Sequence, residues 1–155
     1  MTSTSARMTI LSAALGLALS APAANAWHLV TPQEYARDKA APRFEALVTS
    51  PPAQASPAIR VVQPDISRRL TNPVTIEVQF AAGPGRAINM QSFNATYGWL
   101  GIDITRRVLE HSMKTANGLV ARNVELPPGE HRVTMSITDT SGKTSSETFN
   151  LSVSK

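Results

Sequence analysis

The stretch that decides the fold is Leu126-Pro-Pro-Gly-Glu-His-Arg-Val-Thr-Met-Ser-Ile-Thr-Asp139, which runs into the polar turn 140–143 and a second alternating run ending at Val153. From position 131 onward every second residue falls on one side, and this side carries His131, Val133, Met135 and Ile137. Strict alternation predicts a strand with one buried face and one solvated face. The stretch therefore predicts a β-hairpin of the kind that closes many antiparallel sandwiches.

The same alternation recurs upstream. Residues 74–80 place Val74, Ile76, Val78 and Phe80 on one side. Turn signals made of Gly, Pro and Asn separate this run from further extended runs over 59–61, 92–99, 102–108 and 119–126, whereas the polar residues 109–117 predict a loop. About seven short strands, spaced by about ten residues, indicate an all-β Greek-key sandwich over residues 57–155.

Two segments carry a family resemblance. Residues 72–80 and 126–142 together resemble bacterial immunoglobulin-like domains, and the second is similar to the pattern L-x-x-G-x-H-x-v-x-v-x-v-x-D-x-x-G of many cell-surface and periplasmic sandwich modules. In this pattern Gly129 permits a positive φ, Asp139 can accept hydrogen bonds from turn amides, and Gly142 completes the turn. The resemblance implies an immunoglobulin-like fold and an envelope location, and it brings no catalytic residues.

The N-terminal residues 1–26 have the features of a signal peptide. Arg7 precedes an apolar run over residues 10–19 and a small-residue ending at Ala26. This order predicts a Sec signal peptide cleaved after Ala26, and hence a periplasmic or secreted protein; an uncleaved membrane anchor is the alternative. The apolar run is shorter than the about 20 residues that span a bilayer, and we expect no transmembrane span in the mature chain.

Residues 27–56 are expected to form a short helix and a Pro/Ala-rich linker, a flexible tail ahead of the sandwich. Thr31, Pro32 and Glu34 make a helix-start signature for a helix that ends near Ala40. The prolines that follow predict an extended linker. The chain has no cysteine, which excludes disulfides, thiol catalysis and Cys-based metal sites.

Two groups of residues are candidates for binding. The arginines Arg68, Arg69, Arg106 and Arg107 could contact carboxylate or phosphate, and a solvated basic surface is the plainer interpretation of a chain with net charge +4. Tyr97 and Trp99 lie among glycines and could form a platform for sugar or peptide, or belong to the core. Nucleic acid is not an expected partner, because aromatic residues are not interleaved with the arginines.

The sequence shows few residues that could carry out catalysis or bind a metal. No catalytic constellation is evident, so we expect a non-enzymatic protein without a cofactor or a resident metal. We predict a binding or structural module of the cell envelope, which interacts with an envelope protein or an acidic envelope component by edge-strand pairing or through an arginine patch. The alternative is a periplasmic copper carrier: after cleavage His28 becomes the second residue, and an α-amine beside an imidazole can chelate copper. His131, on the inward face, is interpreted as a satisfied core histidine.

Overall fold

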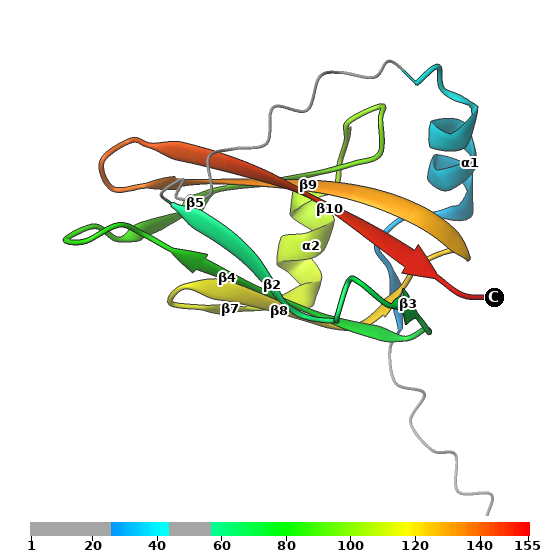
Figure 1. The fold of residues 1–155 in the computed structure, drawn as a ribbon, viewed down its shortest axis with the longest axis horizontal. Helices are drawn as coiled ribbons and strands as arrows, with labels where there is room; N and C mark the ends of the chain where they lie inside the picture. The colour runs from blue at the N-terminus through cyan, green and yellow to red at the C-terminus, as the bar shows by residue number, and fades with distance from the viewer. Residues whose placement is uncertain (1–25, 44–56) are drawn as a thin grey trace, which may run out of the picture.

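A computed structural model describes residues 26–43 and 57–155 as two β-sheets packed face to face, with one short helix at one end and a second that runs between the two sheets (Figure 1). The predicted all-β sandwich is therefore confirmed. Residues 1–25 and 44–56, which hold the predicted signal peptide and most of the predicted linker, lie outside the described residues.

The first sheet is built around β8. In it β2 (Ala58–Gln63) pairs with β4 (Val74–Ala81), and β4 pairs with β8 (Gly118–Glu125), all antiparallel. The far side of β8 pairs with two short strands, β1 (Trp27–His28) in parallel and β7 (Ser112–Thr115) antiparallel. Within the described residues β2 has one partner strand and forms the edge of this sheet.

The second sheet has the strand order β3-β10-β9-β5-β6. Its members are β3 (Arg69–Leu70), β5 (Ile88–Tyr97), β6 (Ile102–Asp103), β9 (Gly129–Asp139) and β10 (Thr144–Val153). The chain crosses from the first sheet to the second after β2, after β4 and after β8, so the two inner faces meet as one core.

The alternation predicted for the two clearest strands is confirmed. The inward residues of β4 and β9 are all buried, and they are Val74, Ile76, Val78, Phe80, His131, Val133, Met135 and Ile137. The turn between β9 and β10 is built as expected: Asp139 Oδ1 accepts hydrogen bonds from the amides of Ser141 (2.8 Å) and Lys143 (3.1 Å), and Gly142 has φ +81°.

The residues that the structure describes form ten strands, not about seven, and residues 105–111 are helical where we expected an extended run and a loop. Three strands have only two residues, too few for an alternating pattern. The helix α2 (Thr105–His111) begins where Asp103 Oδ1 accepts a hydrogen bond from the Thr105 amide (2.8 Å). Ile104 and Val108, four residues apart, are buried on the side that faces the core.

The helix α1 (Pro32–Ala40) starts as predicted, with a complete capping box between Thr31 and Glu34. Residues 27–43 differ from the expected flexible tail, because they pack against the sandwich. Leu29 and Val30 are 4% and 0% exposed, and β1 adds to the first sheet. This packing could not be predicted from the sequence, because two adjacent apolar residues are too few to show the periodicity of a helix or a strand.

Neither helix of the described residues is long and apolar enough to cross a membrane.

Candidate functional site

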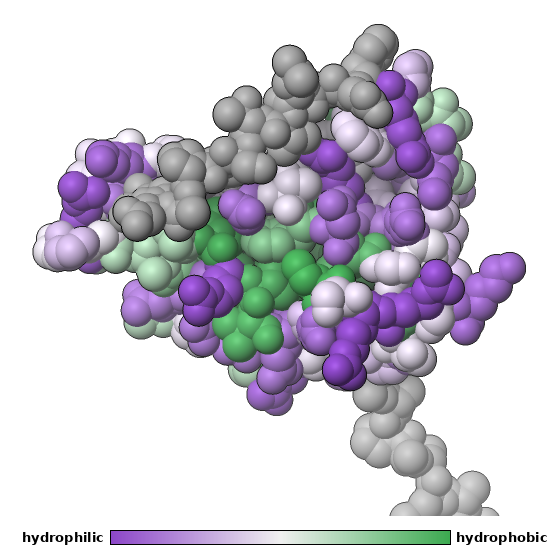
Figure 2. All heavy atoms as spheres, in the orientation of Figure 1, coloured by the Kyte–Doolittle hydropathy of each residue, from purple (hydrophilic) through white to green (hydrophobic). Residues whose placement is uncertain are grey.

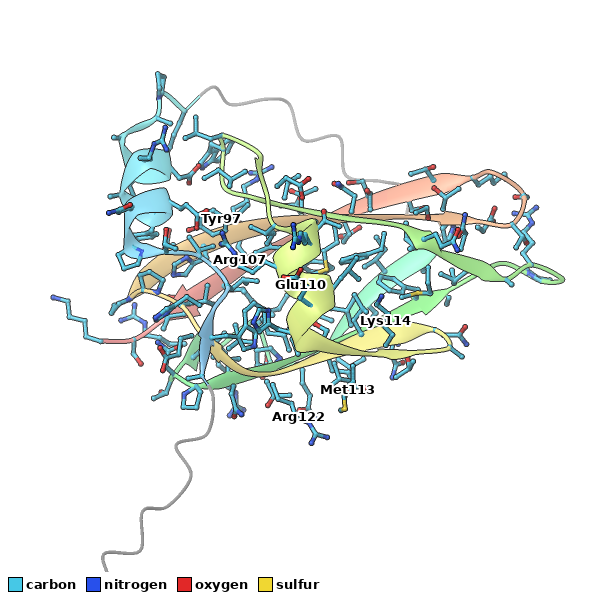
Figure 3. All side chains as sticks on the ribbon, turned by 180° about the vertical axis from the view of Figure 1, so that it is seen from behind. Tyr97, Arg107, Glu110, Met113, Lys114 and Arg122 are labelled. Carbon is cyan, nitrogen blue, oxygen red and sulfur yellow. The ribbon has the colours of Figure 1, made fainter. Side chains whose placement is uncertain are left out.

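An ion pair between the two helices holds the N-terminal segment in place. Arg107 of α2 donates to both carboxylate oxygens of Glu34 of α1, at 2.9 Å each, and to the carbonyl oxygen of Leu29 at 2.8 Å (Figure 3 shows Arg107 on the side of α2 that faces α1). The hydrogen bond from Arg107 lowers the pKa of Glu34 from 4.5 to about 2. Arg107, a predicted ligand contact, is therefore engaged within the protein.

Asp38 connects α1 to the turn between β5 and β6. Its Oδ1 accepts hydrogen bonds from the backbone amides of Trp99 (2.6 Å) and Leu100 (3.0 Å), and the residue is buried. Gly98 has φ +71°, and a Cβ there would collide with the Asp38 carboxylate. The glycine noticed in the sequence thus permits a close approach of helix and turn, which fixes the position of Trp99.

Tyr97 points inward and belongs to a buried hydrogen-bonded chain. Its Oη lies 2.8 Å from Nδ1 of His131, whose Nε2 lies 2.6 Å from the carbonyl oxygen of Pro127. Because a carbonyl oxygen only accepts, Nε2 carries the hydrogen and the hydroxyl of Tyr97 donates to Nδ1. Burial lowers the pKa of His131 and raises that of Tyr97. His131 is a satisfied core histidine, and Trp99 alone of the aromatic pair is open to a ligand.

A hollow of about 400 Å³ lies beside Trp99, and we call it the Trp99 pocket. It is formed by the C-terminal end of α1, the β5–β6 turn, and the outer faces of β9 and β10. Its polar lining residues are Asp38, Lys39, Arg43, Trp99, Glu130, His131, Arg132, Asn150 and Ser152. The guanidinium of Arg132 lies over the Trp99 ring, 4.2 Å from its centroid. Three cations and an indole therefore meet in one concave site.

The four predicted arginines do not form one patch. Arg68 pairs with Asp65 (3.1 Å), and Arg106 pairs with Glu110 (2.7 Å) on α2. Arg68 and Arg69 lie at the β3 edge of the second sheet, whereas α2 follows β6 at the opposite edge. The structure instead brings Lys39 and Arg43, at and just after the end of α1, together with Arg132 of β9. Of these three residues, only Arg132 could be assigned to an outer face from the sequence, because it alternates with the buried residues of its strand.

His28, the candidate copper ligand, lies at the rim of the first sheet. Its Nδ1 is 3.5 Å from a carboxylate oxygen of Glu125, and its side chain is 57% exposed. The neighbouring Trp27 stacks on His111 with ring centroids 4.5 Å apart. In the part of the chain that the structure describes, no three His, Asp or Glu residues are grouped so that they could hold a metal ion.

The edge strand β2 is a second exposed feature. Its outward residue Val62 is 41% exposed, and the inward residues Ile59 and Val61 are only partly buried. β2 lies next to β10 of the other sheet, and Figure 2 shows apolar side chains in the seam between them. An extended segment laid along β2 could therefore form main-chain hydrogen bonds and contact this apolar seam.

Similarity to known proteins is found at the level of structure. No protein-family model matches the chain, and no curated protein matches its sequence. Among solved structures it is similar to CopC from Methylosinus trichosporium OB3b, with a TM-score of 0.40 and 12% sequence identity over 63% of this chain and 94% of that chain.

Proposed function

We propose that the protein is a non-catalytic, exported binding module of the cell envelope, with an immunoglobulin-like sandwich that takes an extended segment of an envelope protein along the edge of β2. The observation that carries this proposal is the edge itself. Within the described residues β2 pairs with β4 alone, so one side of a six-residue strand keeps backbone donors and acceptors for a partner. The exposed Val62 and the adjoining seam add apolar contact.

The charge on this edge favours an acidic partner segment. Arg60 is exposed on the outer face of β2, and a cross-strand neighbour of opposite charge stabilises a strand pair. The partner is then an extended segment with an acidic residue opposite Arg60 and apolar residues toward the seam. Backbone hydrogen bonds would supply most of the affinity, so binding should depend only weakly on salt.

This proposal can be tested by introducing a positively charged residue into the edge strand β2. Lysine on an edge strand blocks pairing, and Val62→Lys changes an exposed side chain. Met113→Lys is the matched control, because Met113 is an exposed apolar residue (54%) on β7, a short strand at the opposite edge of the same sheet, and Figure 3 shows it projecting from the outer face.

We expect the wild-type domain and the Met113→Lys variant to capture the same envelope protein at low salt and at about 0.5 M salt, and to show slowed amide hydrogen exchange over residues 58–63 in the complex. The Val62→Lys variant should not capture it. Equal capture by all three forms, or release of the partner by salt, would show that β2 is not the contact.

A copper carrier is the second candidate. Cleavage after Ala26 would create an α-amine one residue before His28, and the structure adds the Glu125 carboxylate 3.5 Å from the imidazole. Amine and imidazole nitrogens suit copper(II). A chain that begins at Trp27 would then bind one copper ion, seen by its visible absorption, and His28→Ala would abolish the band. The edge-strand proposal expects His28→Ala to keep the protein partner.

A further inference from the structure

We propose that the Trp99 pocket is a ligand site for a monoanionic sugar, a pyranose that carries one carboxylate. The pocket and β2 share no residue, so this inference stands apart from the proposed edge contact. Its basis is a set of three cations, Lys39, Arg43 and Arg132, that lie in one hollow with an aromatic ring, two carboxylates and neutral hydrogen-bonding groups.

Four arginines elsewhere in the described residues form ion pairs, and the cations of the pocket do not. Arg68, Arg86, Arg106 and Arg107 each have a carboxylate partner. In the ranges 26–43 and 57–155, by contrast, no carboxylate forms an ion pair with Lys39, Arg43 or Arg132. Against the two carboxylates of the lining, Asp38 and Glu130, the three cations leave the hollow a net formal charge of +1, which attracts an anion.

Arg132 is already oriented for a planar anion. Its guanidinium lies 4.2 Å from the centroid of the Trp99 ring, and Asp38 fixes the Trp99 backbone through its amide. A guanidinium held over the face of an aromatic ring can still form two parallel N–H···O bonds along its edge. This geometry suits a carboxylate, and the contact with Trp99 lowers the entropy cost of ordering the arginine when a ligand binds.

The neighbours of Arg132 suit hydroxyl groups. In the ladder between β9 and β10, Arg132 is directly opposite Asn150, and Glu130 is directly opposite Ser152. These four residues lie on the outer face of the second sheet, with paired Cβ atoms about 5 Å apart. A ring held by its carboxylate at Arg132 therefore presents hydroxyls to an amide, a hydroxyl and a carboxylate.

Glu130 favours a ligand that carries a single negative charge. A carboxylate only accepts hydrogen bonds, so it favours a hydroxyl donor and opposes a second negative charge. A phosphate dianion is disfavoured for this reason, whereas a sugar acid offers one charge and several hydroxyls. The Trp99 ring is 37% exposed and can contact the apolar face of a pyranose, and about 400 Å³ is the size of a small-ligand pocket.

The experiment is a titration of the ¹⁵N-labelled protein followed by the indole N–H signals. The chain has two tryptophans, so Trp27 provides an internal reference outside the pocket. D-Galacturonate is the probe, D-galactose is its neutral match, and inorganic phosphate tests for simple anion binding. Arg132→Lys keeps the charge but loses the planar fork, and Arg122→Lys on the outer face of the first sheet is the control (Figure 3).

We expect galacturonate to shift the Trp99 signal with a dissociation constant on the order of 1 mM, and galactose and phosphate to leave it in place. Arg132→Lys should weaken binding about fivefold or more, with Arg122→Lys unchanged. The proposal is overturned if galacturonate produces no shift, if galactose or phosphate binds as well as galacturonate, or if both lysine variants behave alike. None of these outcomes bears on capture through β2.

Discussion

Replacing Glu34 with Gln should make the fold less stable at neutral pH and less sensitive to acid. Glu34 receives two hydrogen bonds from Arg107, and the two side chains are only 22% and 31% exposed. Arg107 lowers the pKa of Glu34 from 4.5 to about 2 in the folded protein. A carboxyl group whose folded pKa is depressed stabilises the fold above its unfolded pKa, and this contribution is lost as the pH falls toward the folded pKa.

The magnitude follows from the two pKa values. Each pH unit between them corresponds to about 1.4 kcal/mol, so the ionised Glu34 contributes about 3 kcal/mol at neutral pH. The loss begins near pH 4.5 and is nearly complete near pH 2. Urea unfolding at about pH 6 and about pH 2.5 measures it: the free energy of unfolding should fall by about 2 to 3 kcal/mol more in the wild type than in Glu34→Gln.

Glu110→Gln is the matched control. It removes the same charge from a pair with Arg106, but this pair is exposed to solvent, and such pairs contribute little. The Glu110 variant should therefore follow the wild type at both pH values. If Glu34→Gln unfolds at the wild-type urea concentration near pH 6, or loses as much stability in acid as the wild type does, the ion pair does not hold α1 as we describe.

Three further changes test other parts of the structure. Ser112→Ala should raise the free energy of unfolding by about 1 kcal/mol, because the Ser112 hydroxyl is buried without a hydrogen-bond partner among the described residues; a lower melting temperature would contradict this. Gly98→Ala should destabilise the fold by at least about 2 kcal/mol, because the new Cβ would displace the Asp38 carboxylate. Gly85→Ala is the control, since Gly85 has a similar positive φ but open space around it, and it should cost about 1 kcal/mol. Equal losses of stability in thermal unfolding would show that the contact between Asp38 and the β5–β6 turn does not stabilise the fold. The ring of His131 should titrate below pH 6.5 by NMR, and because its folded pKa is depressed by burial, it should reduce stability as the pH falls below 6.5; a midpoint at or above 6.5 would mean that the ring is solvated.

The parts of the fold that the sequence predicts are those with a local cause. Alternation in β4 and β9 depends on residues two apart, and the turn at Asp139 and the cap at Thr31 depend on residues two to four apart. Each of these patterns is complete within a short stretch of consecutive residues. The sandwich, its two best strands and the start of α1 could be predicted for this reason.

The candidate site could not be predicted in this way, because its residues are far apart in the sequence. Glu34 and Arg107 are 73 residues apart, and Asp38 and Trp99 are 61 apart, so these contacts exist only once the sheets have formed. The arginines that looked notable in the sequence, such as Arg68-Arg69 and Arg106-Arg107, are adjacent in the chain, and three of them are engaged by nearby or distant carboxylates. Sequence adjacency therefore pointed mainly to arginines that form ion pairs in the fold, whereas the cations of the Trp99 pocket come from the end of α1 and from β9, about 90 residues later.

The docking of α1 and the Trp99 pocket are physically one arrangement. Asp38 fixes the turn that carries Trp99, and the next residue, Lys39, supplies a cation to the same pocket. Both depend on a helix that Arg107 holds through Glu34 on its first turn. A ligand that binds only the assembled pocket must therefore favour the docked state of residues 27–43, by an amount set by its concentration and its dissociation constant. Conversely, protonation of Glu34 weakens the pocket without touching any lining residue, whereas the edge of β2, which uses neither helix, keeps its backbone groups available.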